Sequence, residues 1–311
     1  MTAATLSPVP PKVSVCVISY NHEKYLSQCL QSIVDQRTTF PFEVIVGDDC
    51  STDGTPQIIR EFSERYPGLF VSIINLKKIG GTQNYVTTHL RARGEYVAHI
   101  DGDDVAYPGK LQRQVDYLDS NDRVTLVWHG MEFFNDAGKN GGQVHRHIHD
   151  IINTKNILKN DILRFGPLGA ASSVMYRRAF EDYLCDIQTD TLDFYFAARL
   201  LEHGPGARID EILGGYRLNP TTVTLSRSKF NYFQPSPMRM LYASHLSSLY
   251  SRDRRTRDDI FLNSLFNFVV ELKFLRPSVS AFLLLALRTM TWSGVRQVPE
   301  YFGKAFRLRK R

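Results

Sequence analysis

The chain has 311 residues, of which 43% are hydrophobic and 23% charged, and its formal net charge is +6. This composition is typical of a folded globular protein and excludes a disordered or fibrous chain, and the length allows one large domain or two small ones. The basic residues are scattered until the last few positions, so we expect an anionic ligand or surface as partner and no nucleic acid.

The first part of the chain alternates predicted strands and helices. Short apolar runs indicate strands, and apolar residues at helical spacing indicate helices. The expected strands cover residues 13–19, 42–49, 70–76, 96–100 and 124–130, and the expected helices cover residues 20–36, 51–67, 80–94 and 109–122. This alternation predicts an α/β fold with a mostly parallel, doubly wound sheet and right-handed crossovers.

The alternation ends after residue 130. The sequence there predicts a hairpin closed by AGKNGG, a short helix, a strand that turns into a helix, an amphipathic helix and two short strands, at 131–150, 157–166, 169–180, 190–204 and 207–219. Residues 230–311 are expected to be mainly helical and end in the basic GKAFRLRKR. The fold class is therefore a single α/β domain with a helical C-terminal extension.

Several features bear on the cell compartment. The four cysteines, Cys16, Cys29, Cys50 and Cys185, lack metal-binding or disulfide-framework spacing, so reduced thiols are expected. The opening MTAATLSPVPPK predicts no signal peptide, and no stretch reaches the roughly 18 apolar residues of a spanning helix. We expect a cytoplasmic protein whose C-terminal helices either shape an acceptor site or rest on the cytoplasmic face of an anionic membrane.

Acidic residues follow one predicted strand directly. Asp101, Gly102, Asp103 and Asp104 come immediately after the apolar run 96–100. Three carboxylates this close repel one another, and a hard cation such as Mg²⁺ or Mn²⁺ supplies the counter-charge that they need. Because ligands of open α/β sheets bind at the carboxyl ends of strands, the cluster predicts a metal ion that holds phosphate. The alternative is a solvated acidic turn in which Asp103 or Asp104 caps the following helix.

Two earlier predicted strands also end in polar residues. Ser19, Tyr20 and Asn21 follow the first strand, and the second ends at Asp48 and Asp49. In a parallel sheet all three strand ends project from one edge. We therefore expect one acidic, hydrogen-bonding rim.

These stretches resemble the family 2 inverting glycosyltransferases, nucleotide-sugar enzymes with the A-type fold. The matching segments, within residues 13–220, are VSVCVISYNHEKYLSQCLQSIVDQ, FEVIVGDDCSTDGT, GGTQNYVTTHLRARGEYVAHIDGDDVAYPGKLQRQV and TLDFYFAARLLEHG. The resemblance implies a catalytic domain at 12–228, made of a nucleotide-binding half at 12–130 and an acceptor half at 131–228. A flexible segment at 1–11 precedes this domain, and the helical extension covers 229–311.

The resemblance also assigns roles on the nucleotide side. It implies that Ser19, Tyr20 and Asn21 line the base pocket. Asp49 would accept a hydrogen bond from uracil N3–H, which suits a carboxylate because it is acceptor-only, whereas Asp48 would be structural. A turn anchor or helix cap is the alternative for this acidic pair.

Further implied roles concern the ribose, the diphosphate and the metal. Asp101 and Gly102 would lie at the ribose or an ordered water near the ion, and Asp103 would bind the metal directly. Asp104 would cap the next helix. A loop with Gly80, Gly81 and Asn84 would face the ribose or diphosphate, with a plain tight turn as the alternative.

An inverting transfer needs one base to take the proton of the acceptor hydroxyl. The resemblance places this base at Asp193, although many relatives have Glu-Asp where this chain has Leu192-Asp193. An ordinary first-turn carboxylate is the alternative, and Asp190 is the fallback.

Other residues have weaker assignments. Arg177, Arg178 and Arg217 are candidates to face an acceptor or phosphate, with surface salt bridges as the alternative. His145, His147 and His149 would share one strand face and could bind Zn²⁺, although an exposed hairpin strand is the favoured interpretation.

The expected function is a metal-dependent inverting transfer of a single sugar. The donor would be a UDP- or dTDP-sugar, and the acceptor a glycan or lipid-linked molecule of surface polysaccharide synthesis. The chain lacks the Gln-x-x-Arg-Trp signature of processive synthases. The rival hypotheses are a catalytically silent sugar-nucleotide-binding or scaffold protein and, with less support, a sugar nucleotidyltransferase.

Overall fold

The structure is a computed structural model in which the chain divides into two compact units. It describes residues 10–136, 138–143, 156–165, 169–180, 184, 192–218, 253–272, 283 and 286–309. Unit one comprises residues 1–144, 169–190 and 199–219, and unit two comprises residues 145–168, 191–198 and 220–311. Each unit is thus assembled from separate stretches of the chain.

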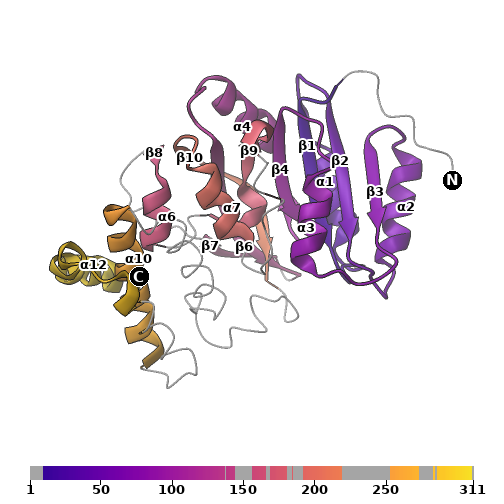
Figure 1. The fold of residues 1–311 in the computed structure, drawn as a ribbon. Helices are drawn as coiled ribbons and strands as arrows, with labels where there is room; N and C mark the ends of the chain where they lie inside the picture. The colour runs from indigo at the N-terminus through magenta and orange to yellow at the C-terminus, as the bar shows by residue number, and fades with distance from the viewer. Residues whose placement is uncertain are drawn as a thin grey trace. The chain divides into compact units, whose positions relative to one another are not determined.

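The strands of unit one lie in the sheet order β3-β2-β1-β4-β9-β6-β10-β5, with β7 beside β6 (Figure 1). Their bounds are β1 Val13–Ser19, β2 Phe42–Asp48, β3 Phe70–Ile74, β4 Tyr96–Asp101, β5 Val105–Ala106, β6 Leu126–Asn135, β7 Gly138–Gln143, β9 Met175–Arg177 and β10 Gly206–Arg217. The first four strands of this order are parallel, and so are β6 and β10, whereas β9 runs antiparallel between β4 and β6. This arrangement confirms the predicted α/β class and its mostly parallel sheet.

Helices connect these strands and also make up most of the described part of unit two. In unit one they are α1 Leu26–Val34, α2 Thr55–Arg65, α3 Gly81–His89, α4 Lys110–Asp119 and the short 3₁₀ helix η1 Ala171–Ser173. Unit two contains β8 Asn156–Ile157, α6 Lys159–Phe165, α10 Arg254–Leu272 and α12 Trp292–Arg309, and α7 Leu192–Leu200 includes residues of both units.

Strand β1 is buried along almost its whole length because helices cover both faces of the sheet. Its odd-numbered residues, such as Val15 and Val17, join a core cluster with Leu26 and Leu30 of α1. On the other face, the Sγ atom of Cys16 lies 3.9 Å from the carbonyl oxygen of Thr88 in α3. A strand buried on both faces needs a continuous apolar run, and for this reason the sequence VSVCVIS indicates a central parallel strand.

Three element boundaries differ from the sequence-based expectation. Helix α1 begins only at Leu26, because Asn21 has a φ of 53° and the next residues form a turn. The predicted hairpin is present, since β6 and β7 pair antiparallel, but the glycines of AGKNGG lie within β7 itself. The two strands expected at 207–219 are one strand, β10, with register shifts on either side of Ile212.

Unit two has its own small hydrophobic core between α10 and α12. Phe261, Leu262, Ala286 and Tyr301 form this core, and the Tyr301 hydroxyl donates to the Arg164 carbonyl at 2.7 Å. None of the helices within the described ranges is long and apolar enough to cross a membrane.

Candidate active site

The carboxyl ends of β1, β2 and β4 meet at one edge of the sheet. Ser19 pairs with Asp48 and Ile18 with Asp101 in the strand registers. Beyond the strands, the Asp49 amide donates to the Ser19 carbonyl at 3.0 Å, and the Gly102 amide donates to the Ile18 carbonyl at 2.8 Å. The three predicted polar segments therefore form one rim.

The loops after β1 and β2 are tied together by side-chain hydrogen bonds. The Asn21 amide donates to Ser51 Oγ at 2.8 Å, and Asn21 Oδ1 accepts from the Thr52 amide at 2.9 Å. Buried Asp48 accepts from the Ser51 amide at 2.9 Å and from the Ser51 hydroxyl, so it anchors the turn. These bonds fix the backbone that carries Tyr20.

Tyr20 is exposed at this rim, and Lys78 lies against it. The Lys78 Nζ atom is 3.7 Å from the centre of the Tyr20 ring, in cation–π contact. The pair joins the β1 end to the loop between β3 and α3. It offers an aromatic surface next to a positive charge.

Asp49 holds the β3–α3 loop at the rim. Its buried carboxylate accepts from the Ile79 amide at 2.7 Å and from the Gly80 amide at 3.1 Å. Gly80 has a φ of 90°, which favours glycine, whereas Gly81 has open space where a Cβ atom would lie. Two carboxylate oxygens have about four acceptor sites, so these amides leave capacity for a ligand donor.

Asn84 is buried beneath this loop. Its Nδ2 donates to the Gly47 carbonyl at 2.9 Å, and its Oδ1 accepts from Asn75 Nδ2 at 3.1 Å. The side chain thus joins the ends of β2 and β3 to the first turn of α3. In this arrangement Asn84 shapes the loop from below, and its predicted ligand contact stays a prediction.

Asp101 and Asp104 have different partners within the acidic cluster. Asp101 Oδ1 lies 3.2 Å from His99 Nε2, whereas buried Asp104 accepts from Ser172 Oγ at 2.5 Å and from the Arg217 amide at 2.8 Å. The prediction that Asp104 caps the next helix is wrong. That helix, α4, begins at Lys110 with Gly109 as its N-cap, and β5 intervenes.

Burial and mutual repulsion set the pKa values of the cluster. Burial raises the pKa of Asp104 well above its usual value, and the charges of Asp103 and Asp101 add to this shift. Burial also raises the pKa of Asp103, and the Asp101 charge adds to it against the opposing effects of His22 and Arg217. For Asp101, burial is the largest single influence and raises the pKa, but the hydrogen bonds and electrostatic effects of His99, His22 and Ser172 together outweigh it, so the pKa is lowered.

A divalent cation fits this donor set. Carboxylate oxygens are hard ligands, and a cation would relieve the repulsion that raises the pKa of Asp103. The buried Nδ1 atom of His22 has no hydrogen-bond partner and lies 2.8 Å from the position of a Cβ atom on Gly102. Within the described ranges no three His, Cys, Asp or Glu side chains are grouped to hold an ion by themselves. Hard divalent ions such as Mg²⁺ usually keep several waters and bind substrate phosphates, so one or two of these carboxylates would suffice to hold one.

Arg217 fastens the backbone of the cluster. Its buried guanidinium donates to the Asp103 carbonyl at 2.8 Å, to Asp136 Oδ1 at 2.9 Å and to Gln28 Oε1. It also lies over the rings of Tyr25 and Phe134, at 4.5 and 4.3 Å. In this arrangement Arg217 positions the acidic loop from behind.

The other two predicted arginines also bind backbone carbonyls. Arg177 donates to the carbonyls of Val124 and Leu118 at 2.8 and 2.7 Å, and Arg178 donates to the Gly94 carbonyl at 2.7 Å. These contacts secure the ends of strands and helices in unit one.

The remaining predicted residues fall partly outside the described structure. Asp193 lies in the first turn of α7, but its side chain is outside the described residues. Asp190, Cys185 and the three histidines His145, His147 and His149 also lie outside them.

Sequence reasoning missed His22, His99 and Ser172. His99 stacks with His89, whose pKa burial lowers well below its usual value, at a ring distance of 5.2 Å. Ser172 contacts two acidic residues but lies about 70 positions away in sequence. No local sequence pattern identifies Ser172 as a site residue. His22, by contrast, directly follows Tyr20-Asn21, a segment that the sequence already places at the site.

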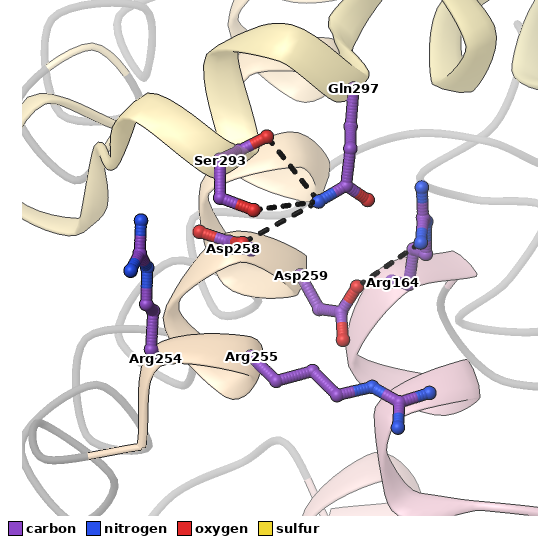
Figure 2. Close-up of a pocket in the computed structure, with 7 residues that line it drawn as sticks. All are labelled: Arg164, Arg254, Arg255, Asp258, Asp259, Ser293 and Gln297. Carbon is purple, nitrogen blue, oxygen red and sulfur yellow. Dashed lines mark hydrogen bonds and ion pairs between the residues drawn. The ribbon is translucent and has the colours of Figure 1, made fainter.

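Unit two contains a separate cavity of about 430 Å³ (Figure 2). It is lined by Arg164, Arg254, Arg255, Asp258, Asp259, Ser293 and Gln297. Arg164 lies 3.5 Å from Asp259 Oδ1, and Gln297 donates to Asp258 Oδ2 at 3.4 Å. Burial raises the pKa of Asp259 to about 6 even beside these arginines. Because opposite charges offset one another here, we assign the cavity no ligand.

Comparison with families places the chain among known proteins. The model of glycosyl transferase family 2 matches residues 14–184. An uncharacterized protein of Mycobacterium tuberculosis is 35% identical over 208 residues, which are 66% of this chain and 58% of that protein. The chain thus spans less than two thirds of the length of this relative.

Two solved structures share the fold. The structure of Staphylococcus aureus TarS residues 1–349, in complex with UDP-GlcNAc, matches with a TM-score of 0.64 and 19% identity. This match covers 96% of the present chain and 81% of the TarS chain. The mannosyltransferase PcManGT of Pyrobaculum calidifontis, in complex with GDP-Man and Mn²⁺, matches with a TM-score of 0.58 and 18% identity. This match covers 99% of the present chain and 86% of the PcManGT chain.

Proposed function

The chain belongs to glycosyl transferase family 2, and on this basis we propose that it is a metal-dependent inverting glycosyltransferase. It moves one sugar from a UDP- or dTDP-sugar to a glycan or lipid-linked acceptor in surface polysaccharide synthesis. The observation that carries this proposal is the meeting of Asp49, Asp101 and Asp103 at one sheet edge. The neighbours in complex with UDP-GlcNAc and GDP-Man support a nucleotide-sugar donor.

The nucleoside occupies the side of the rim next to β2. The base stacks on the exposed ring of Tyr20, between Ser19 and Asn21, and its N3–H donates to the carboxylate of Asp49. The backbone at Gly80 and Gly81 approaches the ribose or diphosphate, which the open space beside Gly81 permits. Lys78, held over Tyr20, adds positive charge near the anionic donor.

The diphosphate occupies the side of the rim next to β4. Asp103 would hold the ion directly, and Asp101 and Gly102 would lie at the ribose or at a water near the ion. A bound Mg²⁺ or Mn²⁺ supplies Lewis-acid neutralisation of the charge that develops on the departing diphosphate. His99 and Arg217 keep the carboxylates and their backbone in place.

Inversion requires in-line attack by the acceptor hydroxyl on the face opposite the diphosphate. Asp193, at the start of α7, takes the proton of that hydroxyl as the new glycosidic bond forms and the bond to the diphosphate breaks. The sugar carbon passes through an oxocarbenium-like state, as in other glycosyl transfers. One displacement at this carbon transfers a single sugar with inversion.

The decisive assay measures nucleoside diphosphate release from a panel of sugar nucleotides, with and without Mn²⁺. Asp103→Ala should abolish metal-dependent nucleotide binding, and Asp193→Asn should retain this binding but stop transfer. Normal turnover by Asp193→Asn would refute the base assignment. Nucleotide binding by the wild-type protein without turnover of any donor and acceptor pair would favour the silent-scaffold alternative.

A further inference from the structure

Unit two exposes apolar side chains over a short stretch that leads into α12. Leu283, Leu287, Met290, Trp292 and Val295 are 38%, 56%, 49%, 80% and 36% exposed, and we call them the 283–295 apolar face. Soluble surfaces usually expose large apolar side chains singly, so five within thirteen residues indicate a contact surface.

The exposed side chains alternate with buried ones along this stretch. Leu283, Leu287 and Met290 are exposed and recur at i, i+4 and i+7, whereas Ala286 and Thr289 are buried. In α12, Trp292 and Val295 lie at i and i+3, whereas Gly294 and Tyr301 face inward. The inner faces already form the core of unit two, so the 283–295 apolar face is available to a partner.

The surroundings of this face are basic. The sequence has no Asp or Glu between Glu271 and Glu300, a stretch that contains Lys273, Arg276, Arg288 and Arg296. Arg288 and Arg296 are exposed among the apolar residues. A second copy docking by two-fold symmetry would bring these like charges together, which disfavours self-association.

We propose that the 283–295 apolar face docks unit two onto a membrane surface rich in anionic lipids. A strongly exposed tryptophan next to arginines suits the boundary between headgroups and acyl chains, where the indole ring is favoured and basic side chains meet phosphate. Leu287 and Met290 enter the acyl boundary, while Arg288 and Arg296 contact headgroups. This docking does not depend on sugar transfer, but it would bring the catalytic unit to lipid-linked acceptors.

Tryptophan fluorescence offers a direct test, because the chain has two tryptophans and only one of them is exposed. Trp128 is buried in β6, and Trp292 is 80% exposed. Vesicles of phosphatidylcholine mixed with phosphatidylglycerol should shift the emission of the full chain to the blue, and vesicles of phosphatidylcholine alone should do so weakly. Trp292→Phe should lose the shift, since Trp128 does not change its surroundings.

Co-sedimentation with the same vesicles measures how much the apolar side chains and the arginines each contribute to vesicle binding. Replacing Leu287, Met290 and Trp292 with Ser together should weaken binding by roughly a hundredfold or more. Leu90→Ser, which removes a side chain of similar exposure in unit one, should leave binding unchanged. Arg288→Gln and Arg296→Gln should each weaken binding about fivefold at low salt, and Arg60→Gln on α2 should not.

Two results would overturn the proposal. One is wild-type protein that neither sediments with anionic vesicles nor changes its emission. The other is a dimer in sedimentation equilibrium that the triple Ser variant dissociates, with no vesicle binding, which would identify a second copy as the partner. Because neither measurement uses turnover, failure here is distinguishable from failure of the proposed transferase activity.

Discussion

Arg217 provides a sharp test of how the acidic loop is held. We expect Arg217→Lys to weaken Mn²⁺-dependent UDP binding by roughly tenfold or more, because outer contacts of a metal site control its affinity on this scale. A lysine keeps the charge but has no planar fork, so it cannot reach the Asp103 carbonyl, Asp136 and Gln28 together. The loop that carries Asp103 would then lose its fixed position.

The stability cost of Arg217→Lys can be worked out from its contacts. Leaving the buried Asp103 carbonyl without its donor costs about 1–3 kcal/mol. Weakened stacking on Tyr25 and Phe134 adds about 1 kcal/mol. The pair with Asp136 adds little, because the Asp136 side chain is mostly exposed. Urea unfolding should therefore show a loss of roughly 2–4 kcal/mol.

Arg177→Lys is the matched control for this prediction. Arg177 likewise fastens the main chain, by donating to three backbone carbonyls, and lies over an aromatic ring, that of Tyr96 at 5.4 Å, but away from the rim. It should cost similar stability and leave UDP binding unchanged. If calorimetric titration with Mn²⁺ and UDP gave the two variants the same Kd, the assigned role of Arg217 would be refuted.

Three further predictions concern the nucleotide loop and unit two. Gly81→Ala should keep full stability in urea, since nothing lies near its Cβ position, but should weaken UDP binding if the nucleotide approaches there; unchanged affinity would remove Gly81 from the site. Asp49→Asn should weaken UDP binding about tenfold, because an amide has one acceptor oxygen and its NH₂ opposes the loop amides; wild-type affinity would contradict the role of Asp49. For Asp259, burial raises the folded pKa to about 6, so wild-type stability should fall as pH rises from about 4 to 6 and stay reduced above. In urea unfolding, the free energy of unfolding of Asp259→Asn should therefore exceed that of the wild type by an amount that grows to about 3 kcal/mol between about pH 4 and pH 8. A difference that does not change with pH would count against this pKa.

The strand ends were predictable because each is a local pattern. An apolar run followed by polar residues predicts a buried strand and a rim, and the ends at Ser19, Asp48 and Asp101 lie where this pattern indicated. The predicted division of 207–219 into two short strands was wrong, because this segment is the single strand β10. Gly214 and Gly215 lie inside it, where Cβ atoms would come within 3.1 Å of the Val105 carbonyl and 2.9 Å of the Phe134 ring. Close packing against these neighbours favours glycine at both positions.

The contacts that distinguish the three acidic residues could not be predicted in this way. Asp104 accepts from Ser172 and from the Arg217 amide, so its partners lie 68 and 113 positions away. Sequence spacing could not show which carboxylate folding would use, and the helix-cap assignment failed for that reason. These two bonds make Asp104 the structural member of the cluster.

The division of partners also bears on the proposed metal role of Asp103. Asp104 is held by protein donors, and Asp101 is oriented by His99. For Asp103 the hydrogen bond from Arg217 goes to the main-chain carbonyl, which fixes the backbone of the acidic loop. Burial beside Asp101 makes the charged form of Asp103 costly, and a divalent ion would lower this cost. This electrostatic cost supports the proposed role of Asp103 as metal ligand, alongside the sequence motif.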